Sequence, residues 1–389
     1  MKNRQLLMIP GPIEFEPAVM RAMGMPTTSH VSPEFIEVFG QALERTREMF
    51  LCPEGQPYIL PGSGTLAMDS VAANLVEPGD RALAIDTGFF SHRYSEILKH
   101  YGGEVTNLSA PAIGDAPSLE AVEKELRTGG YKVMTAAHVD TSSGVCLDVK
   151  GLAALAQQHD VLFIVDGVCS LAAEELRMDE WGVDVALTAS QKAVGTPPGL
   201  ALIVAAPKAM QVFRQRKTPV HSYYADWNNW LPVMEAYEAR TPGYFATPAV
   251  NLVWALNESL KIILSEGLYA RWERHRRMSR ALRAGIEAIG LKVVPARPEL
   301  QAVTVTPPYY PEGVGPSLLD LVKEAGVIVA GGKLPEIKTK YFRIGHMGSV
   351  SETDVLGTIG AVEIGLTRAG YRYDVGAGVK ASTKALAAG

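Results

Sequence analysis

The chain is poor in cysteine and lacks long apolar runs. Its 389 residues include three cysteines, Cys52, Cys146 and Cys169, an odd number whose spacing fits no metal site. This usage argues against a disulfide scaffold and a zinc site, and it predicts a reducing compartment. No apolar segment approaches the roughly 20 residues that a membrane-spanning helix needs. We therefore expect neither a metal nor a membrane partner.

The chain also lacks a large excess of charge of either sign. The formal net charge is −5 at pH 7, which gives no reason to expect nucleic acid or an anionic membrane surface as a partner. One basic cluster, residues 271–277, is accompanied by Trp272 and Met278 at the spacing of an apolar helical stripe. We interpret its arginines as the solvated face of a helix.

Neither end of the chain carries a clear targeting segment. The apolar run at residues 6–9 stops at Pro10, so it is too short for the core of a signal peptide. Residues 386–389 do not form a peroxisomal address of the Ser-Lys-Leu type. We expect a cytoplasmic protein, although the sequence is also compatible with a peroxisomal or mitochondrial location.

Helical and strand patterns alternate from about residue 34 to residue 204. We predict helices at residues 33–50, 66–76, about 91–101 and 149–159. We predict strands at residues 57–60, 81–85, 131–136, 161–165, 183–188 and 200–205. This alternation is typical of α/β proteins in which a mostly parallel sheet is covered on both faces.

The composition changes after about residue 207. Residues 218–248 are rich in aromatic residues, proline and asparagine, and we interpret them as one long loop with a functional or interface role. Further helices are predicted from Pro248 into the 260s and at residues 269–289, and strands at residues 301–306 and 341–344. Because the chain is too long for one compact core, we predict an N-terminal arm (1–15), a large domain (16–265) and a smaller C-terminal α+β domain (266–389).

Two ionisable residues follow neighbouring predicted strands. Asp166 ends the apolar run 161–165, and Lys192 follows the segment that begins at Val185. The end of a buried strand is where an open α/β sheet presents its chemistry. A lysine amine can form an imine with the aldehyde of pyridoxal phosphate (PLP), and a carboxylate can keep the pyridine nitrogen protonated. The pair therefore predicts a PLP site in which both residues are catalytic.

A glycine turn at residues 61–65 lies between a predicted strand and a predicted helix. Its free backbone N–H groups and the helix dipole form an anion site. The turn lacks the Gly-Lys-Ser/Thr ending of a Walker A motif. Residues 62–67 also satisfy the permissive dinucleotide fingerprint, with Asp86 placed for the ribose. A PLP site is preferred because it accounts for the turn, Asp166 and Lys192 together, and an NAD-dependent oxidoreductase is kept as the alternative.

Eight motifs resemble, in the same order, those of the class V aminotransferases, which are PLP enzymes of fold type I. Within that family the chain is most similar to the alanine:glyoxylate aminotransferases, particularly the fungal ones. The motifs lie at residues 7–13, 29–35, 60–66, 138–144, 165–170, 179–192, 244–248 and 341–348. The resemblance implies a large domain with a mostly parallel seven-stranded sheet flanked by helices, and a smaller C-terminal α+β domain.

The resemblance also implies roles for single residues. Lys192 would hold the cofactor and move the Cα proton of the substrate, and Asp166 would pair with the pyridine nitrogen. Phe90 would stack on the cofactor ring, and Thr141 would form a hydrogen bond near its phenolic oxygen. Four further residues would bind the phosphate: Ser63, Gly64, Thr65 and Gln191.

Other implied roles concern the substrate and a second subunit. Arg343 would bind the substrate carboxylate, because a guanidinium offers two parallel N–H donors to it. Gly11 would line the same pocket with its backbone. Tyr244 and Thr247 would reach the phosphate bound by the neighbouring subunit, which implies a homodimer with active sites at the subunit interface.

The implied reaction is the PLP-dependent transamination of alanine with glyoxylate, which gives pyruvate and glycine. The expected partners are thus small amino acids and 2-oxo acids. Serine:glyoxylate and serine:pyruvate aminotransferases share the motifs and stay open as alternatives. A cysteine desulfurase is disfavoured, because its nucleophilic cysteine lies in the C-terminal part of the chain and all three cysteines here precede residue 170. We interpret His138 and His346 as structural residues.

Overall fold

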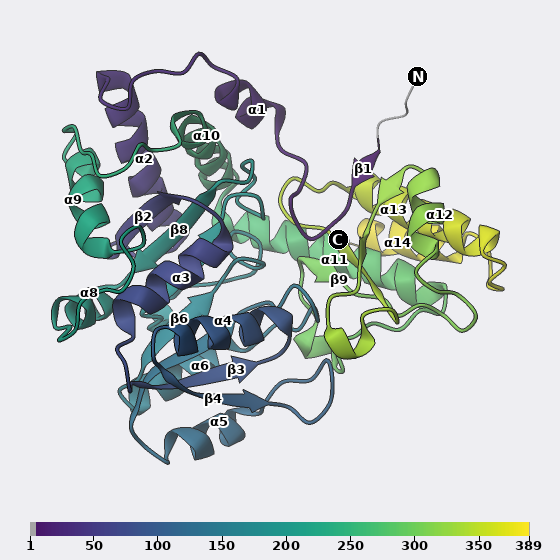
Figure 1. Cartoon of the computed structure of the whole chain (residues 1–389). Helices are drawn as coiled ribbons and strands as arrows, with labels where there is room; N and C mark the ends of the chain where they lie inside the picture. Colours follow the sequence, from purple (N-terminus) through teal and green to yellow (C-terminus); the bar gives the residue numbers. More distant parts are fainter. Residues whose placement is uncertain (1–4, 389) are drawn as a thin grey trace.

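The computed structural model describes residues 5–388, and its centre is a seven-stranded sheet (Figure 1). From edge to edge the strands are ordered β2-β8-β7-β6-β5-β3-β4. Their bounds are β2 (Gln56–Pro61), β3 (Arg81–Asp86), β4 (Glu104–Ser109), β5 (Tyr131–Ala137), β6 (Leu162–Asp166), β7 (Val185–Ala189) and β8 (Leu200–Ala205). Strand β8 runs antiparallel to both of its neighbours, and the remaining neighbours pair in parallel. The prediction of a mostly parallel seven-stranded sheet is confirmed.

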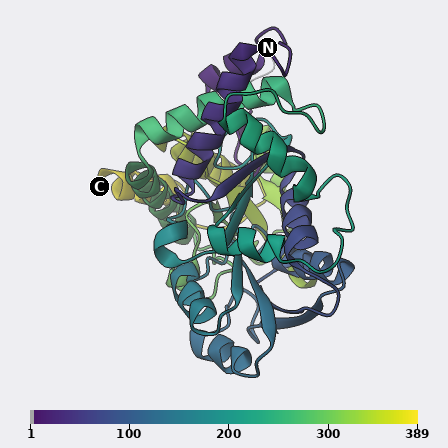
Figure 2. The same ribbon diagram turned by 90° about the vertical axis from the view of Figure 1, so that its left-hand side faces the viewer.

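The inner strands are buried along their whole length. Every residue of β6, β7 and β8 is buried, which is why these strands read as continuous apolar runs. Helices cover both faces of the sheet, as the side view shows (Figure 2). The helices in this part of the chain are α1 (Pro17–Met23), α2 (Pro33–Met49), α3 (Gly64–Leu75), α4 (Phe89–His100), α5 (Leu119–Leu126), α6 (Val149–Gln158), α7 (Met178–Trp181), α8 (Pro207–Arg214), α9 (Trp227–Glu238) and α10 (Val250–Glu266). Within residues 5–388, no helix is long and apolar enough to cross a membrane.

The C-terminal part of the chain builds a second, smaller sheet of three antiparallel strands, ordered β11-β12-β9. Its strands are β9 (Val305–Thr306), β11 (Ala330–Gly331) and β12 (Phe342–Gly345). Four helices belong to this part: α11 (Leu268–Ala288), α12 (Leu318–Glu324), α13 (Glu352–Arg368) and α14 (Ala377–Ala387). The N-terminal arm reaches this part as well, because β1 (Leu6–Leu7) pairs in parallel with β10 (Val327–Ile328).

Two large buried clusters form the core. The larger one packs helices onto the seven-stranded sheet, and the other packs α11 and α13 around β12. The N-terminal arm contributes to both, since Ile13 belongs to the first cluster and Met8 to the second. The proposed domain boundary at residue 266 coincides with the last residue of α10, and it stays a prediction.

An aromatic helix, α9, takes the place of much of the loop predicted at residues 218–248. The Asp226 side chain caps its first turn. Trp227, Trp230 and Tyr237 recur at helical spacing and are fully buried, so they pack the helix onto the core. The prediction of a single long loop is therefore wrong over α9. Asparagine and proline suggested a loop, whereas burial of the aromatic face determines the helix.

The strand predicted at residues 301–306 is also shorter than expected. Only Val305–Thr306 is strand, and Pro298–Leu300 forms a 3-10 turn. The backbone N–H of Ala302 donates to the Gly144 carbonyl (3.1 Å) instead of to a neighbouring strand. A contact with a distant loop therefore replaces the first half of the predicted strand.

The basic cluster at residues 271–277 is not a uniformly solvated face, contrary to our interpretation. Trp272 and Met278 are buried as expected, but Arg271 is only 5% exposed and His275 is fully buried. Arg271 lies inside because its guanidinium donates hydrogen bonds to two backbone carbonyls of the larger core.

Candidate active site

Asp166 and Lys192 meet at one edge of the seven-stranded sheet. Asp166 is the last residue of β6, and Lys192 lies in the turn that follows β7. Strands β6 and β7 are adjacent and parallel, so their carboxyl ends face the same side. Both side chains are buried, with 3% of Asp166 and 8% of Lys192 exposed. The sequence motif therefore brings a carboxylate and an amine into one buried site.

The amine of Lys192 lies against the N-terminal arm. Its Nζ donates a hydrogen bond to the carbonyl oxygen of Pro10. The next residue, Gly11, has a φ of +95°, and a Cβ added there would lie 2.6–2.9 Å from the Cδ, Cε and Nζ atoms of Lys192. Burial lowers the pKa of Lys192, and the positive charges of Arg343 and Lys333 also lower it. The site therefore favours the neutral, nucleophilic form of the amine more than water does.

Asp166 has the opposite acid–base perturbation. Its Oδ1 accepts a hydrogen bond from the Val168 N–H (2.9 Å). Burial raises the pKa of Asp166 to about 7, and the nearby Asp140 carboxylate contributes to the rise. A cation placed beside Asp166 would stabilise its charged form. The carboxylate is therefore suited to a protonated ring nitrogen.

The glycine turn lies at the N-terminus of α3, against the ends of β6 and β7. A Cβ added at Gly64 would lie 2.8 Å from Val168 Cγ2 and 3.2 Å from Ala189 Cβ. Ser63 and Thr65 on either side are exposed. Gln191, the residue before Lys192, lies in the turn that follows β7. The backbone N–H groups of such a helix start attract an anion, and two predicted hydroxyl donors lie beside them.

Phe90 belongs to an aromatic pair flanked by two cations. Its ring centroid lies 5.3 Å from that of Phe89. The Arg93 guanidinium lies 5.0 and 5.1 Å from the centroids of Phe89 and Phe90, and Lys333 Nζ lies 4.6 and 5.4 Å from them. Arg93 Nη1 also donates to Thr65 Oγ1 (3.1 Å). This arginine therefore joins the aromatic pair to the turn at α3.

Sequence reasoning did not find Arg93 or Lys333. Arg93 stands three residues after Phe90 on α4, so helical spacing was a signal that could have placed it beside the ring. Lys333 comes from a distant part of the chain, and no local pattern marks it. Asp140 was also missed. Its Oδ2 accepts from the N–H groups of Phe90 (2.9 Å) and Ser91 (3.0 Å), and so it caps α4.

Arg343 lies in β12, the central strand of the small sheet. Its Nε donates to the Gly331 carbonyl (2.9 Å) and its Nη1 to the Thr141 carbonyl (3.2 Å). The hydrogen bonds found within residues 5–388 do not use Nη2. Two anchors therefore fix the guanidinium plane and leave donor capacity for a carboxylate. The second anchor places Thr141 beside Arg343.

Tyr244 and Thr247 are not joined to the other predicted site residues within one chain. Tyr244 is 65% exposed, and Thr247 is exposed as well. The Tyr244 ring contacts His30, with centroids 5.3 Å apart. Within the described part of the chain, no hydrogen bond links either side chain to the lysine, the aspartate or the turn at α3.

The histidines near the strand ends are buried and neutral. Burial lowers the pKa of His138 to about 4 and that of His346 to about 3. His346 Nε2 shares a hydrogen bond with Thr306 Oγ1 (2.8 Å). All three cysteines are free, and the described residues contain no group of His, Cys, Asp and Glu side chains that could hold a metal ion.

The dinucleotide interpretation of the glycine turn does not fit the topology. A dinucleotide fold places the strand before the turn next to the strand that carries the acidic residue. Here β2 and β3 are separated by four strands, β8, β7, β6 and β5. In addition, Asp86 Oδ1 accepts from Gly88 N–H (3.2 Å) and Ser91 Oγ (3.0 Å). Asp86 thus serves the start of α4.

The chain is similar to known proteins over most of its length. A model of the family described as aminotransferase class-V matches residues 18–344. Alanine–glyoxylate aminotransferase 1 of Saccharomyces cerevisiae is 39% identical over 89% of this chain and 93% of its own. Serine–glyoxylate aminotransferase of Arabidopsis thaliana is 33% identical over 99% of this chain and 96% of its own.

Among solved structures, that of alanine–glyoxylate aminotransferase from Nostoc sp. superposes with a TM-score of 0.88 at 31% identity, covering 94% of this chain and 96% of that one. Sequence and fold therefore agree over nearly the whole length. The chain belongs to the class V aminotransferase family.

Proposed function

We propose that the protein uses PLP to transfer the amino group of alanine to glyoxylate. The observation that carries the proposal is the buried pair of Asp166 and Lys192 at adjacent strand ends, beside the N-terminus of α3. An aminotransferase needs an amine that can hold a cofactor aldehyde, a counter-charge for its ring nitrogen and an anion site for its phosphate. The three lie together here.

The residues around this pair fit PLP. Gln191 Oε1 is buried and has no hydrogen-bond partner in residues 5–388. Rotation of the amide would present its NH₂ group to a phosphate instead. The absence of a side chain at Gly64 keeps the backbone of the α3 start accessible. The residues proposed to hold PLP are Ser63, Gly64, Thr65, Phe90, Thr141, Asp166, Gln191 and Lys192.

When bound, PLP supplies an aldehyde that captures the substrate amine and a ring that accepts electron density from Cα. The chain supplies the proton transfer. Lys192, once free of the cofactor, would remove the proton from the substrate Cα. It would then return a proton to the cofactor carbon that is bonded to the transferred nitrogen. Its lowered pKa favours the neutral form that such a base requires. Gly11 leaves the space that the moving lysine side chain needs.

Arg343 is proposed to bind the substrate carboxylate, which alanine, serine and glyoxylate all carry. Its two backbone anchors orient the guanidinium before the substrate arrives, so little rotamer freedom is lost on binding. The choice of alanine is supported by the yeast and Nostoc relatives. The Arabidopsis relative supports serine as the second candidate donor.

We further propose that the active unit is a homodimer. Tyr244 and Thr247 are exposed in the single chain, and each would complete the phosphate site of the partner subunit. Exposed aromatic side chains cluster in the same region, with Tyr223 81% exposed beside Phe245. Large apolar side chains gathered on a surface are typical of a protein interface.

A visible absorption spectrum tests the proposal. The purified protein should show a yellow band that bleaches when alanine is added and returns with glyoxylate, with one glycine formed per pyruvate. Lys192→Ala should lack this band after unbound PLP is removed. A protein that stays colourless when incubated with PLP would contradict the cofactor. A band that responds to serine but not to alanine would replace the proposed donor.

A further inference from the structure

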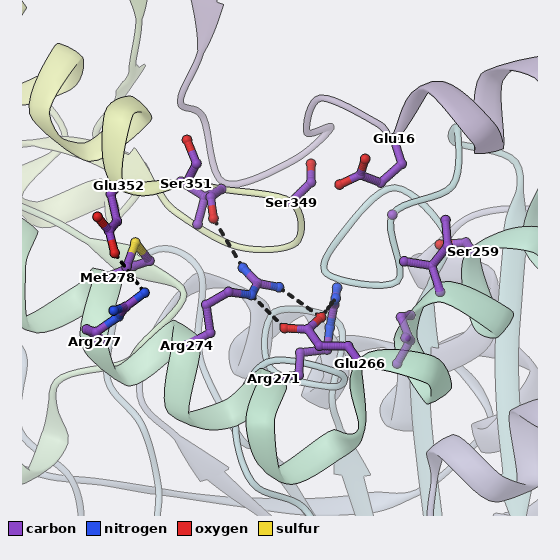
Figure 3. A pocket seen from close by; sticks show the side chains of 14 residues that line it. Glu16, Ser259, Glu266, Arg271, Arg274, Arg277, Met278, Ser349, Ser351 and Glu352 are labelled. Atoms are coloured by element: carbon purple, nitrogen blue, oxygen red, sulfur yellow. Dashed lines mark hydrogen bonds and ion pairs between the residues drawn. The ribbon is translucent and has the colours of Figure 1, made fainter. Parts of the chain in front are cut away.

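A cavity of about 380 Å³ lies behind the lysine turn, between the α10–α11 junction and the loop after β12 (Figure 3). Three arginines and three glutamates are among the residues that line it: Glu16, Glu266, Arg271, Arg274, Arg277 and Glu352. The opposite charges are equal in number, and every arginine has a carboxylate partner. The charged residues that line the cavity therefore form a network of ion pairs, and they do not make a binding site for a free anion.

Arg271 connects this network to the segments that follow the two proposed catalytic residues. Its Nη2 donates to the carbonyl of Ala193 (2.8 Å), the residue that follows Lys192. Its Nε donates to the carbonyl of Ala172 (2.8 Å), in the segment that follows Asp166. Ala172 has a φ of +70°, a conformation that costs energy for a residue with a Cβ and so needs support from its surroundings.

A second contact holds the lysine turn from the same side. Ser259 on α10 donates from Oγ to the carbonyl of Val194. Two successive carbonyls after Lys192 are thus bound by side chains of α10 and α11. The backbone of the turn cannot shift without leaving buried polar groups unpaired, which is energetically unfavourable.

The other end of the network reaches the loop that follows β12, the strand that carries Arg343. Glu266 binds Arg271 Nη1 (2.7 Å) and Arg274 Nε (2.6 Å), and so it bridges the two arginines. Arg274 then donates to the carbonyls of Gly348 (3.0 Å) and Val350 (3.1 Å). These two residues lie in the loop directly after β12.

We propose that Arg271, Glu266 and Arg274 form a positioning relay, which sets the separation between the Lys192 amine and the Arg343 guanidinium. The inference rests on the proposed transamination, in which one substrate must reach both groups at once. The three residues of the relay act through backbone carbonyls and do not touch the substrate. Because 1 Å of misplacement of a reacting group can cost on the order of 10²-fold in rate, the relay affects turnover and not only folding.

The chain offers a matched control in Arg277. It lies on α11, lines the same cavity and pairs with Glu352 (2.8 Å), but it does not bind the lysine turn or the loop after β12 in the hydrogen bonds of residues 5–388. Arg277→Met removes one arginine from the cavity, as Arg274→Met does. Arg271→Lys keeps the charge but cannot reproduce the forked hydrogen bonds of a guanidinium.

The experiment compares Arg271→Lys, Arg274→Met, the double variant and Arg277→Met in the holoenzyme. Four quantities are measured: kcat and KM for alanine, the pH midpoint of the visible band, the calorimetric Kd of propionate as an unreactive carboxylate, and Tm. For both relay variants we expect kcat/KM to fall roughly 10- to 100-fold, with a shifted midpoint and a weaker propionate Kd. The double variant should lose little more than Arg271→Lys alone, since the two act through one relay.

A purely structural role predicts another result. The relay is overturned if Arg271→Lys and Arg274→Met lower Tm as Arg277→Met does, while kcat, KM, the midpoint and the propionate Kd stay within about twofold of the wild type. If the losses in kcat/KM add up in the double variant, Arg271 and Arg274 do not act through one relay. The band midpoint and propionate binding do not require turnover. If the wild type forms no glycine from alanine and glyoxylate, the proposed function fails while these two readouts still test the relay.

Discussion

At the scale of single residues, burial shifts the pKa values of the two proposed catalytic groups in opposite directions. It raises the pKa of Asp166 to about 7 and lowers that of Lys192. Both shifts make the neutral form of the side chain more favourable than it is in water. A charged cofactor ring beside Asp166 would reverse the first shift, whereas the second would assist Lys192 in its proposed role as a base. In the proposed mechanism, the same burial would serve cofactor binding at Asp166 and proton transfer at Lys192.

The raised pKa of Asp166 has a measurable effect on the apoprotein. A carboxyl whose pKa is higher in the folded than in the unfolded state stabilises the fold at low pH, and this stability is lost as pH rises through the folded pKa. Asp166→Asn removes the ionisation but can keep the hydrogen bond to Val168. We expect the variant to exceed the wild type in free energy of unfolding at pH 8 by up to about 4 kcal/mol, and by clearly less at pH 5.

Thermal or urea unfolding of the two apoproteins at both pH values measures this difference. Glu174, whose pKa burial also raises to about 7, is present in both proteins, so its contribution cancels. An equal difference at pH 5 and pH 8 would mean that Asp166 does not change ionisation in this range.

Gly11 is the residue whose replacement should act most directly on the lysine. In Gly11→Ala the new Cβ would overlap the Lys192 side chain, at 2.6–2.9 Å, and would also adopt an unfavourable φ of +95°. Gly79→Ala is the matched control, because its φ is +86° but no atom lies within 4 Å of the added Cβ. Both variants carry backbone strain of about 1 kcal/mol or more, and only in the first does the added Cβ contact the Lys192 side chain.

We expect Gly11→Ala to lose at least about 100-fold in kcat/KM and to change the visible band, and Gly79→Ala to lose stability alone. Turnover, absorbance and Tm of the two variants distinguish these effects. Equal losses of activity in both variants would point to general destabilisation.

The proximity of Asp166 and Lys192 could be predicted from the sequence, whereas their charged surroundings could not. Asp166 and Lys192 follow apolar runs, and the carboxyl ends of adjacent parallel strands lie together whatever the rest of the fold does. Lys333 reaches the aromatic pair from more than 200 residues away, through the packing of the small sheet. Burial of Arg271 was likewise hidden, because two of its partners are backbone carbonyls, which leave no trace in composition.

At the scale of elements, strands were predictable where both faces are buried. Strands β6 and β7 read as unbroken apolar runs, but the edge strand β4 has no buried residue and reads as polar. Helix α13 was missed despite its capping box of Ser351 and Asp354, a signal that could have placed its start. Helix α9 was missed because its asparagines and proline outweighed the aromatic spacing.

Tyr341 joins three segments of the site, and its hydroxyl is the point to test at this scale. It donates to the Ser142 carbonyl (2.6 Å) and accepts from the N–H groups of Lys333 (2.8 Å) and Leu334 (2.9 Å). Tyr341→Phe leaves these buried groups unpaired, at a cost of about 1–3 kcal/mol. Ser142 follows Thr141, whose carbonyl anchors Arg343. We therefore expect KM for glyoxylate to rise more than kcat falls.

Tyr309→Phe is the control for this substitution. Its ring lies 6.4 Å from that of Tyr341, and its hydroxyl makes no hydrogen bond within the described residues. Steady-state kinetics and Tm of both variants provide the test. A fall in Tm without a change in KM for Tyr341→Phe would separate this hydroxyl from substrate binding.

At the scale of the whole molecule, the exposed Tyr244 and Thr247 make a specific prediction about assembly. If each site takes these residues from the partner, a dimer of Lys192→Ala with Tyr244→Ala/Thr247→Ala has one damaged and one intact site. The damaged site carries every substitution, and the other is wild type. Each homodimer by itself should be inactive or strongly impaired. Random exchange of equal amounts gives heterodimers in half of the population. About a quarter of all active sites should then be wild type, so the mixture should recover about a quarter of the wild-type activity.

The measurement mixes the two variants under conditions that exchange subunits, with a different affinity tag on each chain. Tandem purification isolates the heterodimer, whose alanine:glyoxylate activity should be about half that of the wild-type dimer. Tyr269→Ala, a substitution of an exposed aromatic residue on α11, provides a control for the exchange procedure, because its mixture with Lys192→Ala should show no gain over the average of the separate proteins. A purified heterodimer without activity would mean that Tyr244 and Thr247 act within their own subunit, since both sites would then carry a damaged residue.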